Sequence, residues 1–409
     1  MRIGLLSYRS NPFSGGQGIY IKHLSEALKD LGNDVDVISG PPYPLLRKDI
    51  NLIKIPSLDL FAEENRLRTF KTQYFINLTD LTEWFGILTG GFPEPYTFGK
   101  RVKIYLEKRK DSYDILHDNQ SLSYSMLKLQ EDFPLVSTIH HPITKDHRLE
   151  IENSKNWKER LSSNRWHSFL KMQKFVAPRL KTIICPSRQS RKDVIDEFEA
   201  NPDSVEVIPN GIDLKTFKIN KLVKKIPYRI VTTASADIPL KGLRYLVDAL
   251  NNVIKIFPAS TLAVIGKTKE GGEVKRQIDR LNLGEKISFY SDLSESEIVN
   301  LYSSSQLAVI PSLYEGFGFG AGEAMACGVP LISTHSGGLK EVVGEAAIEV
   351  KPGDSDDLTT AILDLFSSPD KQDHFSKIGR KRINDQFQWN KAAKEYIKIY
   401  EEIVDKFPN

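Results

Sequence analysis

Residues 315–330 read EGFGFGAGEAMACGVP, in which two glutamates, Glu315 and Glu323, bracket four glycines. A strand-like run at 306–312, QLAVIPS, comes directly before them, so the glycines fall in a loop at a strand's carboxyl end. Glycines let the backbone approach a ligand closely and present its N–H groups. A helix is expected from about Ala321, and its positive end points into the same space. The stretch therefore predicts an anion site suited to a diphosphate.

The two carboxylates need a different role, because a carboxylate repels a phosphate. Accepting hydrogen bonds from hydroxyl groups suits them, and both sugars and riboses supply hydroxyls. A glycine-rich turn with two surface glutamates fits the same residues. Motifs elsewhere in the sequence are needed to distinguish these two interpretations.

Outward from this stretch, strand-like and helix-like runs alternate along nearly the whole chain. RIGLLSY at 2–8 reads as a strand, and a Gly-rich turn and a helical pattern at 19–32 follow it. The alternation pauses at 211–228, a Lys-rich stretch without a clear period, which we interpret as a domain linker. It restarts at 229–235 with RIVTTAS. This βαβ pattern is typical of a parallel sheet that is covered on both faces.

The pattern predicts an α/β protein with two doubly wound, Rossmann-like domains that face an interdomain cleft. We place the first domain at 1–210 and the second at 211–387. The amphipathic helix expected at about 388–409 packs back on the first domain. Ligands of open α/β sheets bind beyond the carboxyl ends of the strands, so motifs that directly follow strands are the ones to compare.

The composition excludes several classes of protein. A chain of 409 residues favours two domains, and 40% hydrophobic with 27% charged residues is ordinary for a globular protein. A formal net charge of +3 argues against a protein that coats nucleic acid. Two cysteines, Cys185 and Cys327, provide no disulfide framework and fit a reducing cytoplasm. No apolar run approaches the roughly 20 residues of a membrane helix, so any membrane contact is expected to be peripheral.

The glutamate pair, with seven residues between its members, resembles the signature of retaining glycosyltransferases of family 4, which have the two-domain GT-B fold. The resemblance extends over most of the chain. Its other motifs occur in the family's order: GGQGIY at 15–20, STIHHP at 137–142, VIPNGID at 207–213, Lys241–Gly242 and SGG at 336–338.

The resemblance implies a role for individual residues. Glu323 would bind the ribose hydroxyls of a nucleotide, and Glu315 would contact the transferred sugar. Lys241 would neutralise the diphosphate, on which the glycine loop after the first strand would close, and His140 would sit beside the anomeric carbon. The implied catalytic residues are His140, Lys241 and Glu315, and the implied donor-binding residues are Gly15, Gly16, Ser235, Lys241, Glu315, Gly316, Phe317, Gly318, Phe319 and Glu323.

The implied activity is retaining transfer of a hexosyl unit from a nucleotide-sugar to a hydroxyl acceptor, without a cofactor or a metal. A UDP-sugar is the favoured donor and GDP-mannose the next, and a lipid-linked or envelope glycan is the suggested acceptor. Two alternatives stay open: an epimerase or phosphorylase on the same fold, and a donor-binding protein that has lost catalysis. A nicotinamide dehydrogenase is disfavoured, because GGQG lacks the GxGxxG spacing.

The chain departs from the family pattern at two places. An arginine usually precedes the lysine, but Ser235 and Ala236 stand where it is expected, and Arg244 is a candidate replacement. FGAG at 319–322 stands where the family often has a proline and a larger residue, which predicts a looser loop.

The first domain is expected to bind the acceptor. Residues 155–181 carry eight basic residues and one acid, Glu159, with interleaved aromatic residues. Such a segment either lies on an anionic membrane or packs on the sheet as a solvated helix. Residues 80–101 are rich in Gly, Pro and aromatic residues, and they predict a long loop that lines the acceptor pocket or caps the cleft.

The histidines of STIHHP complete the candidate site. His140 and His141 are adjacent on a strand and point to opposite faces, so they are not expected to serve one site. A metal cluster with Asp146 and His147 is disfavoured because the spacing matches no ligand pattern. We expect a cytoplasmic protein without a nucleic-acid partner, and peripheral contact with the inner face of the membrane stays open.

Overall fold

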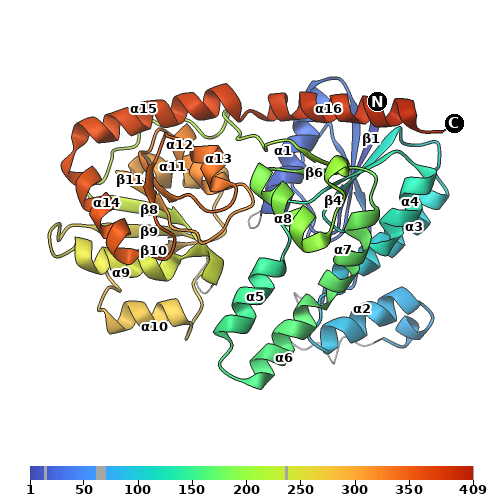
Figure 1. Cartoon of the computed structure of the whole chain (residues 1–409), viewed down its shortest axis with the longest axis horizontal. Coiled ribbons are helices and arrows are strands. Elements are labelled where there is room, and N and C mark those ends of the chain that lie inside the picture. Colours follow the sequence, from blue (N-terminus) through green and yellow to red (C-terminus); the bar gives the residue numbers. More distant parts are fainter. Residues whose placement is uncertain (13–15, 61–70, 235–237, 409) are drawn as a thin grey trace. The chain divides into compact units, whose positions relative to one another are not determined.

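The computed structural model describes residues 1–12, 16–60, 71–234 and 238–408. It divides the chain into two compact units. Unit 1 contains Met1–Pro209 and Ala392–Asn409, and unit 2 contains Asn210–Lys391. In each unit, strands form a layer with helices around it (Figure 1).

Unit 1 is built on a seven-stranded sheet with the order β3-β2-β1-β4-β5-β6-β7, in which every pair is parallel. The chain reverses its direction of winding between β1 and β4, so these two neighbours form the topological switch point where ligands of such sheets bind. The strands are β1 (Arg2–Ser7), β2 (Asp34–Ser39), β3 (Asn51–Lys54), β4 (Ile115–Asn119), β5 (Leu135–Thr138), β6 (Ile183–Cys185) and β7 (Val205–Val207).

Helices connect the strands of unit 1, and several begin at side chains that cap them. Asn77, Ser123 and Ser187 each accept a hydrogen bond from a backbone N–H of the first turn. Helices α2, α5 and α6 lie at the opposite end of unit 1 from α16 (Figure 1). The helices are α1 (Gly16–Asp30), α2 (Leu78–Leu88), α3 (Glu94–Glu107), α4 (Tyr124–Asp132), α5 (Thr144–Asn153), α6 (Trp157–Trp166), α7 (Leu170–Val176), α8 (Arg188–Phe198) and α16 (Trp389–Lys406).

Unit 2 has a six-stranded parallel sheet with the order β10-β9-β8-β11-β12-β13. The strands are β8 (Arg229–Thr233), β9 (Thr261–Ile265), β10 (Ile287–Tyr290), β11 (Leu307–Ile310), β12 (Leu331–Thr334) and β13 (Ile348–Val350). The helices are α9 (Leu243–Val253), α10 (Glu273–Arg280), α11 (Glu295–Ser304), α12 (Phe319–Ala326), α13 (Leu339–Val343), α14 (Ser355–Ser367) and α15 (Pro369–Gln386), and a 3-10 helix, η6 (Pro239–Lys241), follows β8.

Successive residues of the unit 2 strands belong to core clusters on opposite faces of the sheet. Ile230 and Val309 pack in one cluster, while their neighbours Val231 and Ala308 pack in the other. Both faces are therefore covered, which explains why these strands are continuous apolar runs rather than alternating ones. The expected α/β architecture with two Rossmann-like sheets is confirmed.

Two stretches differ from the sequence-based expectation. Residues 211–228, interpreted as a linker, pack on unit 2: Ile212 and Phe217 are buried in its core, and Ile212 N–H donates to Phe387 O. The prediction of a long loop at 80–101 is wrong, because α2 and α3 occupy most of this stretch. Among the described residues, none of the helices combines the length and the hydropathy that crossing a membrane requires.

Candidate active site

The glycine loop joins β11 to α12, which begins at Phe319, two residues before the expected Ala321. Gly318 is the N-cap of α12 and has φ of 106°, a left-handed conformation that favours glycine. A Cβ atom at this position would lie 2.4 Å from Leu339 Cδ2. Both the backbone angle and the space therefore require glycine at this turn.

The small residues of FGAG bring α12 into close contact with the rest of unit 2. A Cβ atom on Gly320 would lie 2.1 Å from Thr233 Oγ1, at the end of β8, and one on Gly322 would lie 2.6 Å from Ile212 Cδ1. The expectation of a looser loop is therefore wrong, because the missing side chains allow closer packing.

Two aromatic side chains of the loop between β11 and α12 pack against neighbouring aromatic rings. Phe317 packs edge-on against Phe387, with ring centroids 5.9 Å apart, and Phe319 stacks on Trp389 at 6.4 Å. Because these side chains serve packing, the backbone of residues 317–319 supplies the groups that a ligand would meet.

Lys241 and Glu315 form an ion pair at the carboxyl edge of the sheet. Lys241 Nζ lies 2.7 Å from Glu315 Oε1, and Ser312 Oγ donates to the same oxygen at 2.9 Å. Lys241 ends η6, where Gly242 has φ of 65°, and a Cβ there would lie 2.1 Å from Pro311 O. The Lys-Gly pair is thus held directly against the end of β11.

The order of the strands explains why these motifs meet. The loops after β8, β11 and β12 are neighbours because the three strands are adjacent in the sheet. Leu313 N–H donates to Leu240 O at 2.7 Å, and Gly338 N–H donates to Glu315 O at 2.7 Å. The Lys-Gly pair, the glutamate loop and the SGG motif therefore form one connected edge of unit 2.

Glu323 lies inside α12 and is 8% exposed. The hydroxyl of Tyr302, a fully buried residue of α11, donates to Glu323 Oε2 at 3.3 Å and lies 3.2 Å from Gly320 O. Burial raises the pKa of Glu323 to about 7, and the Tyr302 hydrogen bond opposes this shift. A carboxylate with one partner of this kind retains lone pairs for two neighbouring hydroxyls, as a ribose presents.

In unit 1, the ring of His140 is oriented by Asn119 at the end of β4. His140 Nε2 lies 2.8 Å from Asn119 Oδ1, while Asn119 Nδ2 donates to Ser7 Oγ at 3.2 Å and to Gln17 O at 3.4 Å. A backbone carbonyl only accepts, so the amide nitrogen must face Gln17 and the amide oxygen must face the histidine. Nε2 of His140 therefore carries the proton. Burial lowers the pKa of His140 to about 3, which keeps the ring neutral and leaves Nδ1 as an acceptor.

Gln120 holds the backbone around His140. Its Oε1 accepts from His140 N–H at 2.7 Å, and its Nε2 donates to His141 O at 2.8 Å. Ser190 Oγ donates to His140 O at 2.8 Å. Asn119 and Gln120 were missed by the sequence analysis, although the polar run that ends β4 at the switch point was a usable signal.

A buried polar cluster connects this region to the two helices α1 and α16. Tyr20 of α1 donates to the Tyr396 hydroxyl at 2.8 Å, and its ring packs edge-on against His140 with centroids 4.7 Å apart. His117 Nε2 lies 2.7 Å from Thr138 Oγ1 in the same cluster. The N-terminal part of α1 thus contacts His140 through Tyr20.

The remaining sequence-predicted residues take other positions. Gly16 begins α1 and is exposed, whereas Gly15, Ser235 and the neighbouring Ala236 lie outside the described residues. Arg244, the candidate replacement for the missing arginine, has its guanidinium over the ring of Tyr245, 4.6 Å from the centroid. The structure thus gives Arg244 an aromatic partner beside it in α9.

The residues of the disfavoured metal cluster around STIHHP take part in two separate contacts. His141 Nε2 lies 3.4 Å from Asp146 Oδ2, and His147 stacks on His167 with ring centroids 4.7 Å apart. In the described part of the chain, no group of three or more His, Cys, Asp or Glu residues has an arrangement that could hold a metal ion.

Comparisons with known proteins identify the family of this chain. The family described as Glycosyltransferase Family 4 matches residues 14–216, and the one described as Glycosyl transferases group 1 matches residues 215–382. The MMP alpha-(1->4)-mannosyltransferase of Mycolicibacterium hassiacum is 38% identical over 99% of this chain and 98% of its own length. The glycogen synthase of Mycobacterium tuberculosis is 25% identical over 98% of this chain and 94% of its own.

Solved structures share the fold at lower sequence identity. Sucrose-phosphate synthase of Thermosynechococcus elongatus superposes with a TM-score of 0.75 and 22% identity, covering 99% of this chain and 100% of its own. HepE of Anabaena, solved with UDP and glucose, gives a TM-score of 0.71 and 17% identity, covering 98% of this chain and 100% of its own. The chain therefore belongs to glycosyltransferase family 4 and has the GT-B fold.

Proposed function

We propose that this glycosyltransferase moves an α-mannosyl unit from GDP-mannose to a hydroxyl group of a glycan, with retention of the anomeric configuration. The observation that carries the proposal is the connected edge of unit 2, where Lys241, Glu315 and the glycine loop supply a cation, a carboxylate and backbone amides. The choice of mannose rests on the 38% identity to a mannosyltransferase over nearly the full length of both chains. It reverses the order of donors that the sequence alone favoured.

Each donor group has a chemically matched partner in this proposal. Lys241 and the amides before α12 bind the diphosphate, a task for which a compact ammonium and a helix N-terminus are suited. Glu323 accepts hydrogen bonds from the ribose hydroxyls, and Glu315 accepts from the transferred sugar. His140 is assigned to the sugar. Gly16, at the start of α1, is assigned to the diphosphate.

Catalysis then rests on positioning and on stabilising the leaving group. The bond between C1 and the β-phosphate oxygen breaks while the acceptor oxygen bonds to C1 on the same face. The acceptor's proton passes to the departing phosphate oxygen, so GDP and an α-mannoside are the products. Lys241 stabilises the negative charge that GDP gains, and the protein needs no nucleophile of its own.

The stereochemical part of the proposal is tested by the product. GDP-mannose labelled with ¹³C at C1 is incubated with a methyl glycoside of an α-(1→4)-linked mannotetraose, and the new anomeric signal is followed by NMR. An α signal supports retention. A β signal, or transfer from UDP-glucose in its place, would overturn this proposal.

Peripheral contact with an anionic membrane is proposed as the setting of the reaction. On α6, Trp157 is 68% and Leu161 is 61% exposed, one helical turn apart, beside the basic residues Lys158 and Arg160. Exposed apolar side chains next to cations suit the interface of an anionic bilayer. Co-sedimentation with phosphatidylglycerol vesicles should fall when Trp157→Ala and Leu161→Ala are combined. Sedimentation that is equal for both proteins would argue against a membrane role.

A further inference from the structure

A small pocket lies at the carboxyl edge of the unit 1 sheet, beside the stretch 80–101. Its walls are Tyr8 after β1, Gly40 after β2, Ser57 after β3, and Glu94, Phe98 and Arg101 of α3. The pocket has room for a group the size of a hydroxyl rather than for a whole sugar ring. Its position is the edge where open α/β sheets bind their ligands.

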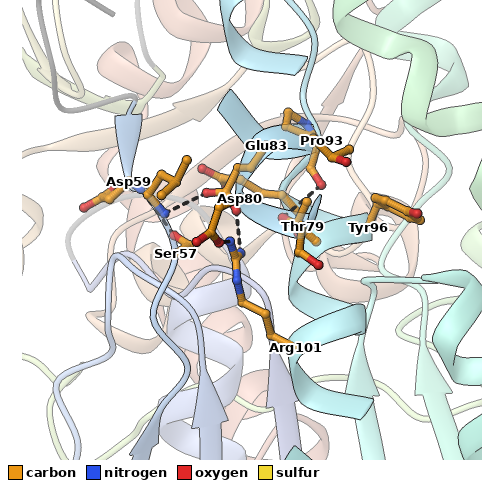
Figure 2. A network of polar contacts seen from close by, with 12 residues as sticks. Ser57, Asp59, Thr79, Asp80, Glu83, Pro93, Tyr96 and Arg101 are labelled. Atoms are coloured by element: carbon orange, nitrogen blue, oxygen red, sulfur yellow. Dashed lines mark hydrogen bonds and ion pairs between the residues drawn. The ribbon is translucent and has the colours of Figure 1, made fainter. Parts of the chain in front are cut away.

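Both carboxyl oxygens of Glu83, which lies beside Arg101, are hydrogen-bonded within the protein. Arg101 bonds to Asp80 Oδ1 at 2.6 Å and to Glu83 Oε2, and Leu58 N–H donates to Glu83 Oε1 at 2.8 Å. Figure 2 shows Arg101 reaching both carboxylates from α3. Glu83 therefore has a structural role: its carboxylate joins α2 to α3 and to the segment after β3.

Glu94 differs from Glu83 because its carboxyl has spare hydrogen-bonding capacity. It is 5% exposed, and its side-chain contact within the described residues is Arg9 Nη1, at the long distance of 3.5 Å. Burial raises the pKa of Glu94 to about 8, the charge of Arg9 opposes this shift, and Glu83 and Asp59 add to it. Near neutral pH the group is therefore a protonated acid that both donates and accepts. Buried acids of this kind in a pocket are typical of functional sites.

We propose that this pocket is an acceptor subsite, in which the Glu94 carboxyl hydrogen-bonds a hydroxyl group of a saccharide acceptor. The inference rests on the proposed function for the identity of the acceptor. A neutral glycan suits the pocket, because Tyr8 and Phe98 provide apolar walls and the carboxyl provides one directional polar group. The stretch 80–101 thereby takes the acceptor role suggested by its sequence, although as helices.

The test measures saccharide binding without any donor. Saturation-transfer NMR with the methyl glycoside of the α-(1→4)-linked mannotetraose is compared for the full-length wild type, Glu94→Met and Glu107→Met. Glu107 lies at the exposed end of α3 and serves as the matched control. We expect Glu94→Met, which keeps the length of the side chain but can neither donate nor accept, to weaken saccharide binding by about tenfold, which corresponds to the loss of one hydrogen bond to a buried acid. GDP binding and the control variant should be unchanged.

A second variant provides the test in case Glu94→Met folds poorly. Ser57→Leu places bulk at the wall of the pocket and leaves Glu94 in place, and it should weaken saccharide binding to a similar extent. The proposal is overturned if the wild type binds no saccharide, or if a folded variant binds it as well as the wild type. Saccharide binding that depends on Glu94 in a protein that does not use GDP-mannose would support the subsite and reject the proposed donor.

Discussion

Lys241 Nζ lies 2.7 Å from Glu315 Oε1, so the cation assigned to the diphosphate and the carboxylate assigned to the sugar are paired with each other. The side chains are 34% and 17% exposed, so the pair is partly shielded from water. A donor that binds here must share or replace this contact. The ion pair therefore holds the lysine in place before the donor arrives, at the cost of competing with the phosphate.

This competition predicts opposite effects of two substitutions on GDP affinity. Lys241→Ala removes the cation and should weaken GDP binding by about tenfold or more, and turnover should fall at least as far. Glu315→Gln releases the lysine and should bind GDP more tightly than the wild type, while sugar transfer is lost. Isothermal calorimetry with GDP measures both affinities. Weaker GDP binding by Glu315→Gln would show that the carboxylate does not compete with the phosphate.

The raised pKa of Glu323 predicts that donor affinity depends on pH. The ionised carboxylate is the better acceptor for two ribose hydroxyls, so the complex releases a proton and GDP should bind more tightly as pH rises through about 7. Tyr302→Phe removes a hydrogen bond that lowers this pKa, so the midpoint should move to higher pH. Titrations with GDP across this range check both effects. A pH profile that is identical in Glu323→Gln would exclude Glu323 as the titrating group.

The contact between Asn119 and His140 predicts a single tautomer. The imidazole should stay neutral with its proton on Nε2 down to about pH 4, because burial lowers its pKa to about 3. Asn119→Asp places a carboxylate beside Nε2 and should raise this pKa, whereas Asn119→Leu should release the ring and mix the tautomers. Nitrogen-15 chemical shifts of the imidazole report both properties directly. A wild-type ring protonated on Nδ1 would contradict the orientation assigned to Asn119.

Glu94 predicts a stability that falls as pH rises. Its pKa is raised from 4.5 to about 8, so between these values the folded state binds more protons than the unfolded state. The free energy of unfolding should then fall by up to about 1.4 kcal/mol per pH unit in this window. Glu94→Gln should remove this dependence and should be more stable than the wild type at the upper end. Urea titrations at several pH values, with Glu107→Gln alongside, provide the comparison.

The sequence predicted the architecture because its strands are buried on both faces and its turns are marked by glycine. The strand expected at 2–8 corresponds to β1, and the helical pattern at 19–32 corresponds to most of α1. The glutamate loop was placed correctly at a strand's carboxyl end. These features depend on local patterns, which a single sequence carries.

The stretch 80–101 was misread because its turn residues were taken to describe the whole segment. Gly90, with φ of 79°, follows the end of α2, and Pro93 is the N-cap of α3, so the glycines and prolines form only a short connection. The apolar residues of α2 gave no clean stripe, because Leu78 and Phe85 are exposed. The expected helical period was therefore hidden.

The contacts within the candidate site could not be predicted from local patterns. Lys241 and Glu315 are 74 residues apart, and their pairing depends on β8 and β11 being neighbours in the sheet. Asn119 meets His140 for the same reason, because β4 pairs with β5. Motifs gave the candidate residues, and the strand order determined which of them meet.

The central claim is tested most directly by a panel of UDP- and GDP-linked sugars. Each is scored by calorimetric binding and by slow release of free nucleotide, with the wild type beside Glu323→Ala. We predict that GDP-mannose binds to the wild type and is slowly hydrolysed, and that the variant loses both properties by about tenfold or more. A wild type that binds no sugar nucleotide, or a Glu323→Ala protein that binds and hydrolyses GDP-mannose as the wild type does, would contradict the proposed donor site.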